Sequence, residues 1–221
     1  MRLRVSLLLV IVVSLAAPAL AQKRSITEKD LFNFVWIGDP QLSPDGSRVA
    51  FVRVTVNDKK DGYNTAIWTV TTANAETRQL TNGPRDTTPR WSPDGKYLVF
   101  VRAPEVSGRT DPAQLFMLAM SGGEPFQFTT LPRGAGGPQW SPDGKMIAFY
   151  NSATAEELAK AAAKNTAQPS PSPSPSPSPE RESDVRVINR AVYRANGAGY
   201  LDFKHPQHIW VVNAPKPVTK K

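Results

Sequence analysis

The feature that most restricts the fold of this 221-residue chain is a tetrapeptide that occurs three times at a constant interval. Ser-Pro-Asp-Gly begins at Ser43, Ser92 and Ser141, so both intervals are 49 residues. A short run rich in apolar, β-branched and aromatic residues follows each copy. A constant period of this length indicates a repeated supersecondary unit whose copies stack against one another.

The tetrapeptide has the composition of a tight turn. Proline presets φ at the first central position of a type I turn, serine suits the opening position, and glycine suits the closing one. The alternative is that the three aspartates, Asp45, Asp94 and Asp143, bind a metal or act in catalysis. An acid repeated at the same place in the same turn is better explained as part of a hairpin. We therefore predict that each copy joins two antiparallel strands.

Two more strands recur in the repeated units. The first of them is predicted at Ile67–Val70, Leu115–Leu118 and Ile209–Val212, and the second at Thr77–Thr81 and Phe126–Thr129. Each unit therefore holds about four short strands, which is the content of one β-propeller blade. The fold class that we predict is all-β: an incomplete β-propeller of about three to four blades, each of four antiparallel strands. The aromatic residues are expected to pack mostly between blades.

The third unit carries additional sequence between two of its strands. Thr154-Ala155-Glu156-Glu157 is a capping box, and it opens an Ala/Lys/Glu helix that is predicted to run to about Lys164. Pro169–Pro179 then alternates proline and serine, which is typical of a solvated polyproline II spacer. We predict an exposed insertion here; a recognition ligand for another protein is the alternative. A strand region is expected over Asp184–Arg194, before a turn at Asn196-Gly197.

The N-terminal segment has the layout of a secretory signal peptide. Arg2 and Arg4 precede the largely apolar run Val5–Ala17, and Ala19-Leu20-Ala21 is a small-x-small cleavage site. An uncleaved N-terminal anchor is the alternative. We expect an exported protein, periplasmic or secreted, with no stable membrane span. The predicted organisation is a signal peptide (1–21), a lead-in with a short helix (22–40), propeller blades (41–152), the inserted helix and Pro/Ser-rich linker (153–183), and a continuation of the propeller that is truncated (184–221).

We expect the propeller to be truncated because the sequence ends before the last strand of the third unit. Leu80 and Phe128 lie 13 residues after Ile67 and Leu115, whereas the same step from Ile209 passes the last residue, Lys221. Propellers usually need four to eight blades. We expect a fragment of a longer protein.

These repeats resemble the propeller repeats of the TolB protein and of the prolyl oligopeptidase family of serine peptidases (S9-type). The segments that favour the peptidases, dipeptidyl- and acylaminoacyl-peptidase-like members, are Ile26–Leu31, Ile37–Gly46, Asp184–Arg190 with Tyr193, Gly199-Tyr200 and His208–Val212. The resemblance implies a propeller that filters peptides for a C-terminal α/β-hydrolase domain with a Ser/Asp/His triad. That domain is missing from this sequence, which has no Gly-x-Ser-x-Gly motif, so no catalytic residue is assigned.

The remaining groups of residues give only weak indications of a metal, catalytic or phosphate-binding site. Without cysteine there is no thiol nucleophile and no Cys-ligated metal. His205 and His208 with Asp202 are a poor metal set and are better explained as loop residues. The arginines at 186, 190 and 194 (Arg186, Arg190, Arg194) would share one face of a strand, where they either grip a peptide carboxylate or, as we favour, face solvent. Gly134–Gly137 lacks the context of a phosphate loop.

The sequence thus predicts no cofactor, no metal site and an isolated chain without enzymatic activity. The net charge of +8 forms no continuous basic stripe, so nucleic acid is not an expected partner. The function that we predict is the N-terminal, substrate-gating propeller portion of an exported S9-type peptidase. Its partners would be peptide substrates of the parent enzyme and the missing hydrolase domain. The alternative is a TolB-like exported propeller that binds proteins.

Overall fold

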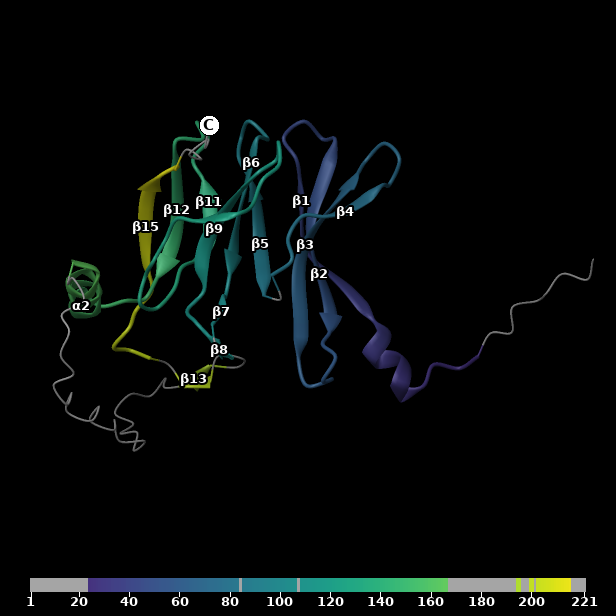
Figure 1. The fold of residues 1–221 in the computed structure, drawn as a ribbon, viewed down its shortest axis with the longest axis horizontal. Helices are drawn as coiled ribbons and strands as arrows, with labels where there is room; N and C mark the ends of the chain where they lie inside the picture. The colour runs from purple at the N-terminus through teal and green to yellow at the C-terminus, as the bar shows by residue number, and fades with distance from the viewer. Residues whose placement is uncertain are drawn as a thin grey trace, which may run out of the picture. The chain divides into compact units, whose positions relative to one another are not determined.

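The computed structural model describes residues 24–83, 85–106, 108–166, 194–195, 199–200 and 202–215 (Figure 1). Residues 24–34 belong to one compact unit and the remaining described residues to a second. The first unit contains the short 3-10 helix η1 (Glu28–Asn33). At its start the Asp30 carboxylate accepts a hydrogen bond of 2.8 Å from the Thr27 amide and pairs with Arg24. The short helix expected in the lead-in is therefore present. Among the described residues, no helix is both long and apolar enough to cross a membrane.

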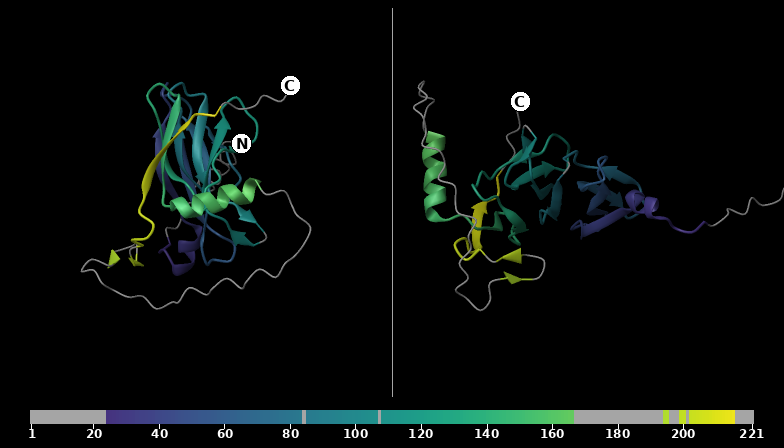
Figure 2. Two further views of the ribbon diagram at one scale, coloured as in Figure 1. Left: turned by 90° about the vertical axis from the view of Figure 1, so that its left-hand side faces the viewer. Right: turned by 90° about the horizontal axis from the view of Figure 1, so that it is seen from below.

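The second unit consists mainly of three antiparallel sheets that stand side by side (Figures 1 and 2). The first sheet is β1 (Val35–Leu42), β2 (Arg48–Val56), β3 (Tyr63–Thr71) and β4 (Thr77–Gln79). The second is β5 (Asp86–Trp91), β6 (Tyr97–Arg102), β9 (Gln114–Ala119) and β10 (Phe126–Gln127). The third is β11 (Gly136–Trp140), β12 (Met146–Asn151) and β15 (His208–Asn213). Short hairpins pair β7 (Glu105–Val106) with β8 (Arg109–Thr110) and β13 (Arg194–Ala195) with β14 (Gly199–Tyr200).

This arrangement confirms the predicted all-β class and the incomplete propeller. The first two sheets have four strands each in their chain order, and the described part of the third has three. The first strand begins at Val35, within the segment expected to be a lead-in, because residues 35–42 pair along β2. The outer strands end at Gln79 and Gln127, two residues earlier than the patterns indicated. There the hydroxyls of Thr81 and Thr129 accept hydrogen bonds of 3.0 and 2.8 Å from the backbone amides of Ile67 and Leu115. Side-chain oxygens thus take the place of backbone carbonyls where the strand pairing ends.

The three Ser-Pro-Asp-Gly segments form three nearly identical turns. In the second copy, the Ser92 hydroxyl donates to Asp94 Oδ1 at 2.6 Å and accepts the Tyr97 amide at 2.9 Å. Asp94 Oδ1 also accepts the Lys96 amide at 3.1 Å. Gly95 has a φ of 69°, in the left-handed region that favours glycine. The prediction that each tetrapeptide forms a turn between two antiparallel strands is confirmed.

The sheets are held together by their alternating side chains. We call the side of a sheet that faces the next sheet along the chain its front and the opposite side its rear. Ala50 and Ile67 on the front of the first sheet pack against residues on the rear of the second, among them Leu98 and Phe100. The front of the second sheet then packs against the third in the same way, through a cluster that includes Val99, Val101, Leu115, Met117, Ile147 and Phe149. Both sides of the second sheet are therefore buried in the apolar core.

The insertion lies where the sequence predicted it. β12 pairs with β15 from Met146↔Asn213 to Asn151↔His208, so neighbouring strands of one sheet are joined across the inserted residues. The helix α2 (Ala155–Thr166) begins one residue after Thr154, whose amide donates to Glu157 at 2.8 Å. The predicted Glu156–Lys160 pair is present at 2.8 Å. The Pro/Ser tract, the strand expected at 184–193 and the signal peptide lie outside the described residues.

Candidate functional site

The first strands of the three sheets are β1, β5 and β11, and we call them the inner strands. β5 lies between the other two and contacts both β1 and β11. Each has an irregularity at the same place in the repeat, where the pairing with its neighbour shifts. At that place Asp39, Thr88 and Gly137 have positive φ angles of 46°, 49° and 58°. Each of the three is followed by a proline, at positions 40, 89 and 138. The repeated bulge bends each inner strand at the same level.

The bulge places polar groups of neighbouring inner strands together. Asp39 Oδ2 accepts a hydrogen bond of 2.7 Å from Arg90 Nη1, and Asp39 Oδ1 accepts one of 2.7 Å from Gln41 Nε2. Thr88 adopts a left-handed backbone conformation that is costly for a β-branched residue. Its Oγ1 is buried and has no hydrogen-bond partner among the described residues. Because backbone strain and unpaired polar groups gather at functional positions, the inner strands are our first candidate site.

Tryptophan side chains fix the spacing of the inner strands. The indole Nε1 of Trp91 donates to the carbonyl of Gln41 at 3.0 Å, and that of Trp140 donates to the carbonyl of Arg90 at 3.2 Å. Both bonds run from one sheet to the preceding one. Leu42 occupies the tryptophan position in the first sheet and has no such donor.

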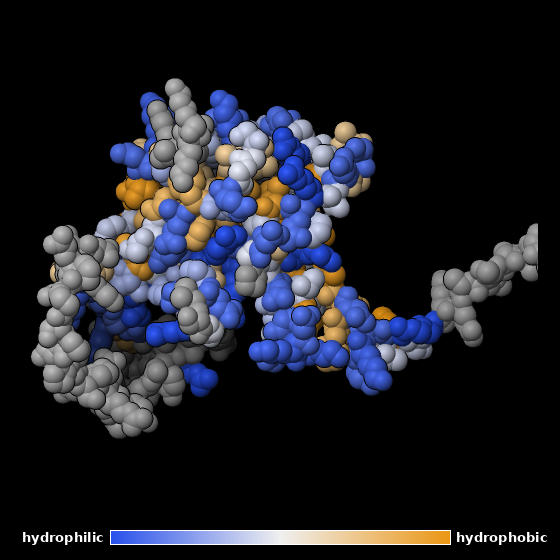
Figure 3. Space-filling model, viewed as in Figure 1, coloured by the Kyte–Doolittle hydropathy of each residue, from blue (hydrophilic) through white to orange (hydrophobic). Residues whose placement is uncertain are grey.

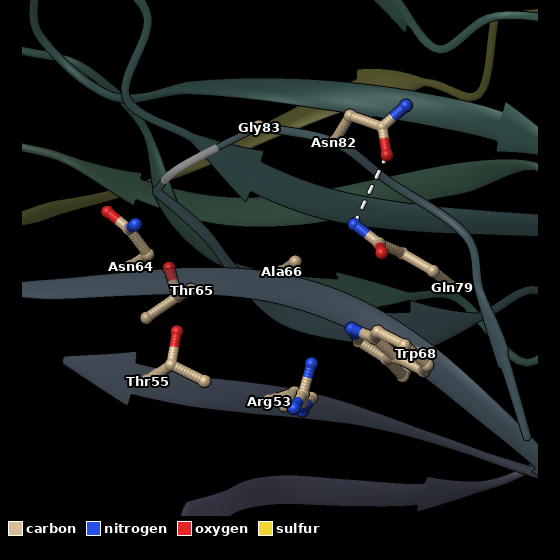
Figure 4. Close-up of a pocket in the computed structure, with 9 residues that line it drawn as sticks. All are labelled: Arg53, Thr55, Asn64, Thr65, Ala66, Trp68, Gln79, Asn82 and Gly83. Carbon is tan, nitrogen blue, oxygen red and sulfur yellow. Dashed lines mark hydrogen bonds between the residues drawn. The ribbon is translucent and has the colours of Figure 1, made fainter. Parts of the chain in front are cut away.

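A second candidate is a pocket of about 230 Å³ in the first sheet (Figure 4). Its nine lining residues include one cation and no carboxylate: Arg53, Thr55, Asn64, Thr65, Ala66, Trp68, Gln79, Asn82 and Gly83. The Arg53 guanidinium lies 4.9 Å from the centre of the Trp68 ring, and Gln79 donates to Asn82 at 3.1 Å. Guanidinium, amides and hydroxyls donate hydrogen bonds, so the pocket suits binding. Its lining residues do not include a nucleophile paired with a base, the combination that covalent catalysis needs.

A third polar group joins the insertion to the third sheet. His205 Nδ1 lies 2.7 Å from Asp202 Oδ2, and His205 Nε2 lies 3.5 Å from Glu157 Oε1. Arg133 bridges the same two acids, at 3.2 Å from Asp202 and 3.6 Å from Glu157. The hydrogen bond from His205, more than any other contact, lowers the pKa of the Asp202 carboxyl, and that from the Thr154 amide lowers the pKa of Glu157. We call these four residues the Arg133 cluster.

The structure also places the remaining residues that the sequence singled out. The part of the chain described here contains no group of three or more acids and histidines suited to a metal ion. His205 and Asp202 enter the Arg133 cluster, whereas His208 opens β15 on the edge of the third sheet. Arg194 lies in β13, and positions 186 and 190 lie outside the described residues. Gly136 and Gly137 leave room for the ring of Tyr150, a packing role.

The turn aspartates have ordinary structural partners. The hydroxyl of Ser43, then that of Ser47, lowers the pKa of Asp45 to about 2. Hydrogen bonds from Ser92 and Ser141 lower the pKa of Asp94 and Asp143 in the same way. Sequence reasoning missed the bulge, although prolines spaced by 49 residues before each tetrapeptide were a usable signal.

Comparisons with known proteins agree with this architecture. The family model described as "PD40: TolB beta propeller domain" matches residues 18–182. "Uncharacterized peptidase YuxL" of Bacillus subtilis (strain 168) is 41% identical over 113 residues, which are 51% of this chain and 17% of that protein. The chain therefore spans about a sixth of this relative.

Two solved structures share the fold at low sequence identity. Pyrococcus horikoshii acylaminoacyl peptidase, in its orthorhombic form, has a TM-score of 0.55 and 14% identity over 86% of this chain and 25% of its own. The AtxE2 isopeptidase has a TM-score of 0.54 and 16% identity over 87% of this chain and 31% of its own. The matched family model covers about three quarters of the sequence, including all three tetrapeptide turns and the inner strands. The chain therefore belongs to the PD40 family of TolB beta propeller domains.

Proposed function

We propose that this chain is the N-terminal propeller portion of an exported S9-type serine peptidase, in which it gates and orients peptide substrates. Hydrolysis would be carried out by a C-terminal α/β-hydrolase domain encoded outside the present sequence. The observation that carries the proposal is the 41% identity to a protein named as a peptidase. The fold shared with acylaminoacyl peptidase supports the same assignment.

The inner strands are the part of the chain that would meet the substrate. They offer hydrogen-bond donors and acceptors at a fixed level, around the Asp39–Arg90 pair. An extended peptide needs such partners for its backbone amides and carbonyls, because unpaired polar groups are costly away from water. The charges of Asp39 and Arg90 offset each other, so selection would act through size and backbone hydrogen bonding more than through substrate charge.

The first test is the coding sequence that continues this reading frame. We expect it to encode a Gly-x-Ser-x-Gly motif followed by an aspartate and a histidine. Unrelated sequence at that place would end the proposal. Export is tested separately, by N-terminal sequencing of the protein recovered from the periplasm or medium, with Gln22 expected as the first residue.

Gating is tested with the complete enzyme and a series of peptides of increasing length. We expect short peptides to be preferred, and a variant without the propeller to lose that preference while still cleaving a small chromogenic ester. The same length preference with and without the propeller would contradict gating without touching the family assignment. The chain by itself is expected to hydrolyse none of these substrates, since it lacks the triad.

A TolB-like, protein-binding propeller is the second candidate, and the family match favours it. It predicts no hydrolase domain in the same gene. It also predicts that the folded chain alone retains a binding partner, which affinity capture with a defined candidate protein would measure.

A further inference from the structure

A hollow of about 340 Å³ lies between the first and second sheets, and we call it the junction hollow. One wall is the front of the first sheet, where the polar lining residues are Arg48, Thr69, Thr71 and Arg78. Leu118, Met120 and the turn after β9 line the side that belongs to the second sheet. In the space-filling view, hydrophilic and hydrophobic residues adjoin over these two sheets (Figure 3). Both walls are supplied by neighbouring sheets of the chain.

The same place is filled in the next junction, between the second and third sheets. Strand pairing makes four residues of the second sheet equivalent to the four polar ones, in the same order: Tyr97, Met117, Ala119 and Phe126. Met117 is 0% exposed, and Tyr97 and Phe126 pack against the buried cluster of that junction. Because a hollow forfeits the contacts that a packed junction gains, the polar set of the first junction does not serve packing.

Three donors of the first junction have no partner among the described residues. No hydrogen bond or ion pair within the described ranges involves the guanidinium of Arg48 or of Arg78. Thr69 is only 5% exposed, and its hydroxyl also has no partner in that part of the chain. Thr71 differs, since its hydroxyl accepts a hydrogen bond of 3.1 Å from the Glu76 amide. Buried polar side chains are normally hydrogen-bonded, so the hydroxyl of Thr69 in the lining of the hollow indicates a ligand.

The charges around the hollow favour an anionic ligand. Glu76 is the one acid among the described lining residues, and its carboxylate accepts a hydrogen bond of 3.5 Å from Asn74. Asp45 and Asp94 border another hollow that also touches Arg48, but both carboxylates accept hydrogen bonds inside their own turns. Two guanidiniums therefore face one carboxylate in the lining. Guanidinium groups bind carboxylates strongly, through charge-assisted hydrogen bonds that are often paired.

The rest of the lining favours a ligand that also has an apolar part. Leu80, Leu118 and Met120 border the hollow and belong to or pack against the apolar cluster between the sheets. Gly122 and Gly123 add no side chains, and a Cβ at either position would meet nothing within 4 Å. The hollow thus presents cations and a hydroxyl on one side and apolar surface on the other, as binding pockets for small molecules commonly do.

We propose that the junction hollow binds an organic carboxylate with an apolar body, the chemistry shared by the C-terminal residue of a peptide and by a free acyl amino acid. Arg48 and Arg78 would bind the carboxylate, with the Thr69 hydroxyl as a third donor. Leu118 and Met120 would contact the apolar body. The proposal goes beyond the gating function and does not depend on it.

Binding is tested by titrating the complete chain with N-acetyl-L-leucine and following its backbone amides by two-dimensional NMR. Saturable shifts are expected at Arg78 and at the turn residues Gly122 and Gly123, with a Kd of about 1 mM for a ligand of this size. N-acetyl-L-leucinamide has the same body without the charge and should bind at least tenfold more weakly. Inorganic sulfate has charge without the body and should also bind more weakly.

Substitutions on the first sheet test the assignment of the donors. Arg48→Gln and Arg78→Gln should each raise the Kd about tenfold or more, because a charge-assisted hydrogen bond is lost. Arg109→Gln is the matched control: it removes an exposed arginine of β8 outside the hollow and should leave the Kd unchanged. Thr69→Met introduces the side chain that Met117 provides in the second sheet, and by filling the hollow it should abolish binding. Circular dichroism confirms that each variant is folded.

The tripeptide N-acetyl-Ala-Ala-Leu separates the two sources of the ligand. Tighter binding than that of N-acetyl-L-leucine would support the site with a peptide terminus as its ligand, and weaker binding would support it with a free acid. The absence of saturable shifts at the turn after β9 overturns the proposal. So does equal binding of the amide or of sulfate, or a Kd that neither arginine variant changes, since the donors and the apolar wall would then not select the ligand.

Discussion

Gly83 lies against the buried ion pair of the second sheet. Asp86 is 0% exposed and binds Arg102 through two hydrogen bonds of 2.7 and 2.8 Å. The Arg102 guanidinium also lies 5.0 Å from the Phe116 ring. A Cβ at position 83 would collide with the Asp86 carboxylate and lie 2.7 Å from Arg102 Nε. Glycine is required here by the closeness of two charged groups that cannot separate without leaving a buried charge unpaired.

Gly83→Ala is predicted to lower the free energy of unfolding by about 1–3 kcal/mol, because the ion pair must shift to admit the methyl group. Urea denaturation followed by tryptophan fluorescence measures this change. Gly62→Ala is the control, since its Cβ would meet only Asn57 at 3.4 Å. Equal stability of the two variants would show that the pair moves freely.

The tetrapeptide turn is the element that the sequence predicted most completely. Proline, glycine and the Ser–Asp pair act within a few residues of one another, so local chemistry decides the conformation. The bonds from Trp91 and Trp140 are different, because their acceptors lie 50 residues away in the chain. The repeat predicted that the tryptophans would be packed between blades, yet their hydrogen-bond partners became visible only when neighbouring sheets were in place.

The turns also predict a dependence of stability on pH. The folded pKa of Asp45 is lowered to about 2 from an ordinary 3.8, so its carboxylate stabilises the fold fully above pH 4. That contribution is lost as the pH falls through about 2. Asp45→Asn should therefore be less stable than the parent at pH 7, and the two should converge towards pH 2.

Denaturation midpoints measured from pH 7 to pH 2 give the comparison. Asp58→Asn, at an exposed turn residue whose carboxylate makes no hydrogen bond within the described part of the chain, is the matched control for removing a surface charge. If the offset of Asp45→Asn from the parent does not change with pH, the turn does not bind the charged form.

The indole bonds are tested by replacing tryptophan with phenylalanine. Trp140→Phe should cost about 1 kcal/mol of unfolding free energy, because the Arg90 carbonyl loses its donor. Trp210→Phe provides the contrast: Trp210 Nε1 is buried without a partner among the described residues, so its removal should be neutral or stabilising. Thermal unfolding of both variants decides, and a greater loss for Trp210→Phe would contradict this reasoning.

In the second unit as a whole, the Arg133 cluster determines where the insertion lies. Arg133 follows β10, Glu157 belongs to α2, and Asp202 and His205 precede β15. They come together because β12 and β15 pair across the insertion and bring its two ends to one edge of the third sheet. Half-exposed ion pairs of this kind contribute about 0–1 kcal/mol each. The cluster therefore orients the helix without contributing much to global stability.

Arg133→Gln is predicted to speed hydrogen exchange of the α2 amides roughly fivefold, corresponding to about 1 kcal/mol of lost attachment, and to leave β6 and β9 unchanged. Hydrogen–deuterium exchange with mass spectrometry resolves these segments. Lys160→Gln breaks the Glu156–Lys160 pair within the helix and should have a smaller effect. Unchanged exchange in α2 for Arg133→Gln would show that other contacts hold the helix.

The amino-acid sequence by itself determined the repeat, the turns, the strand content of each blade and the place of the insertion. All of these follow from periodicity and from interactions between residues that are near in the chain. Tertiary structure alone decided the Asp39–Arg90 pair between neighbouring sheets, the confinement of Gly83 and the Arg133 cluster. Each of these joins groups that are in different strands or sheets. Their distances depend on how the sheets stack, which no local pattern encodes.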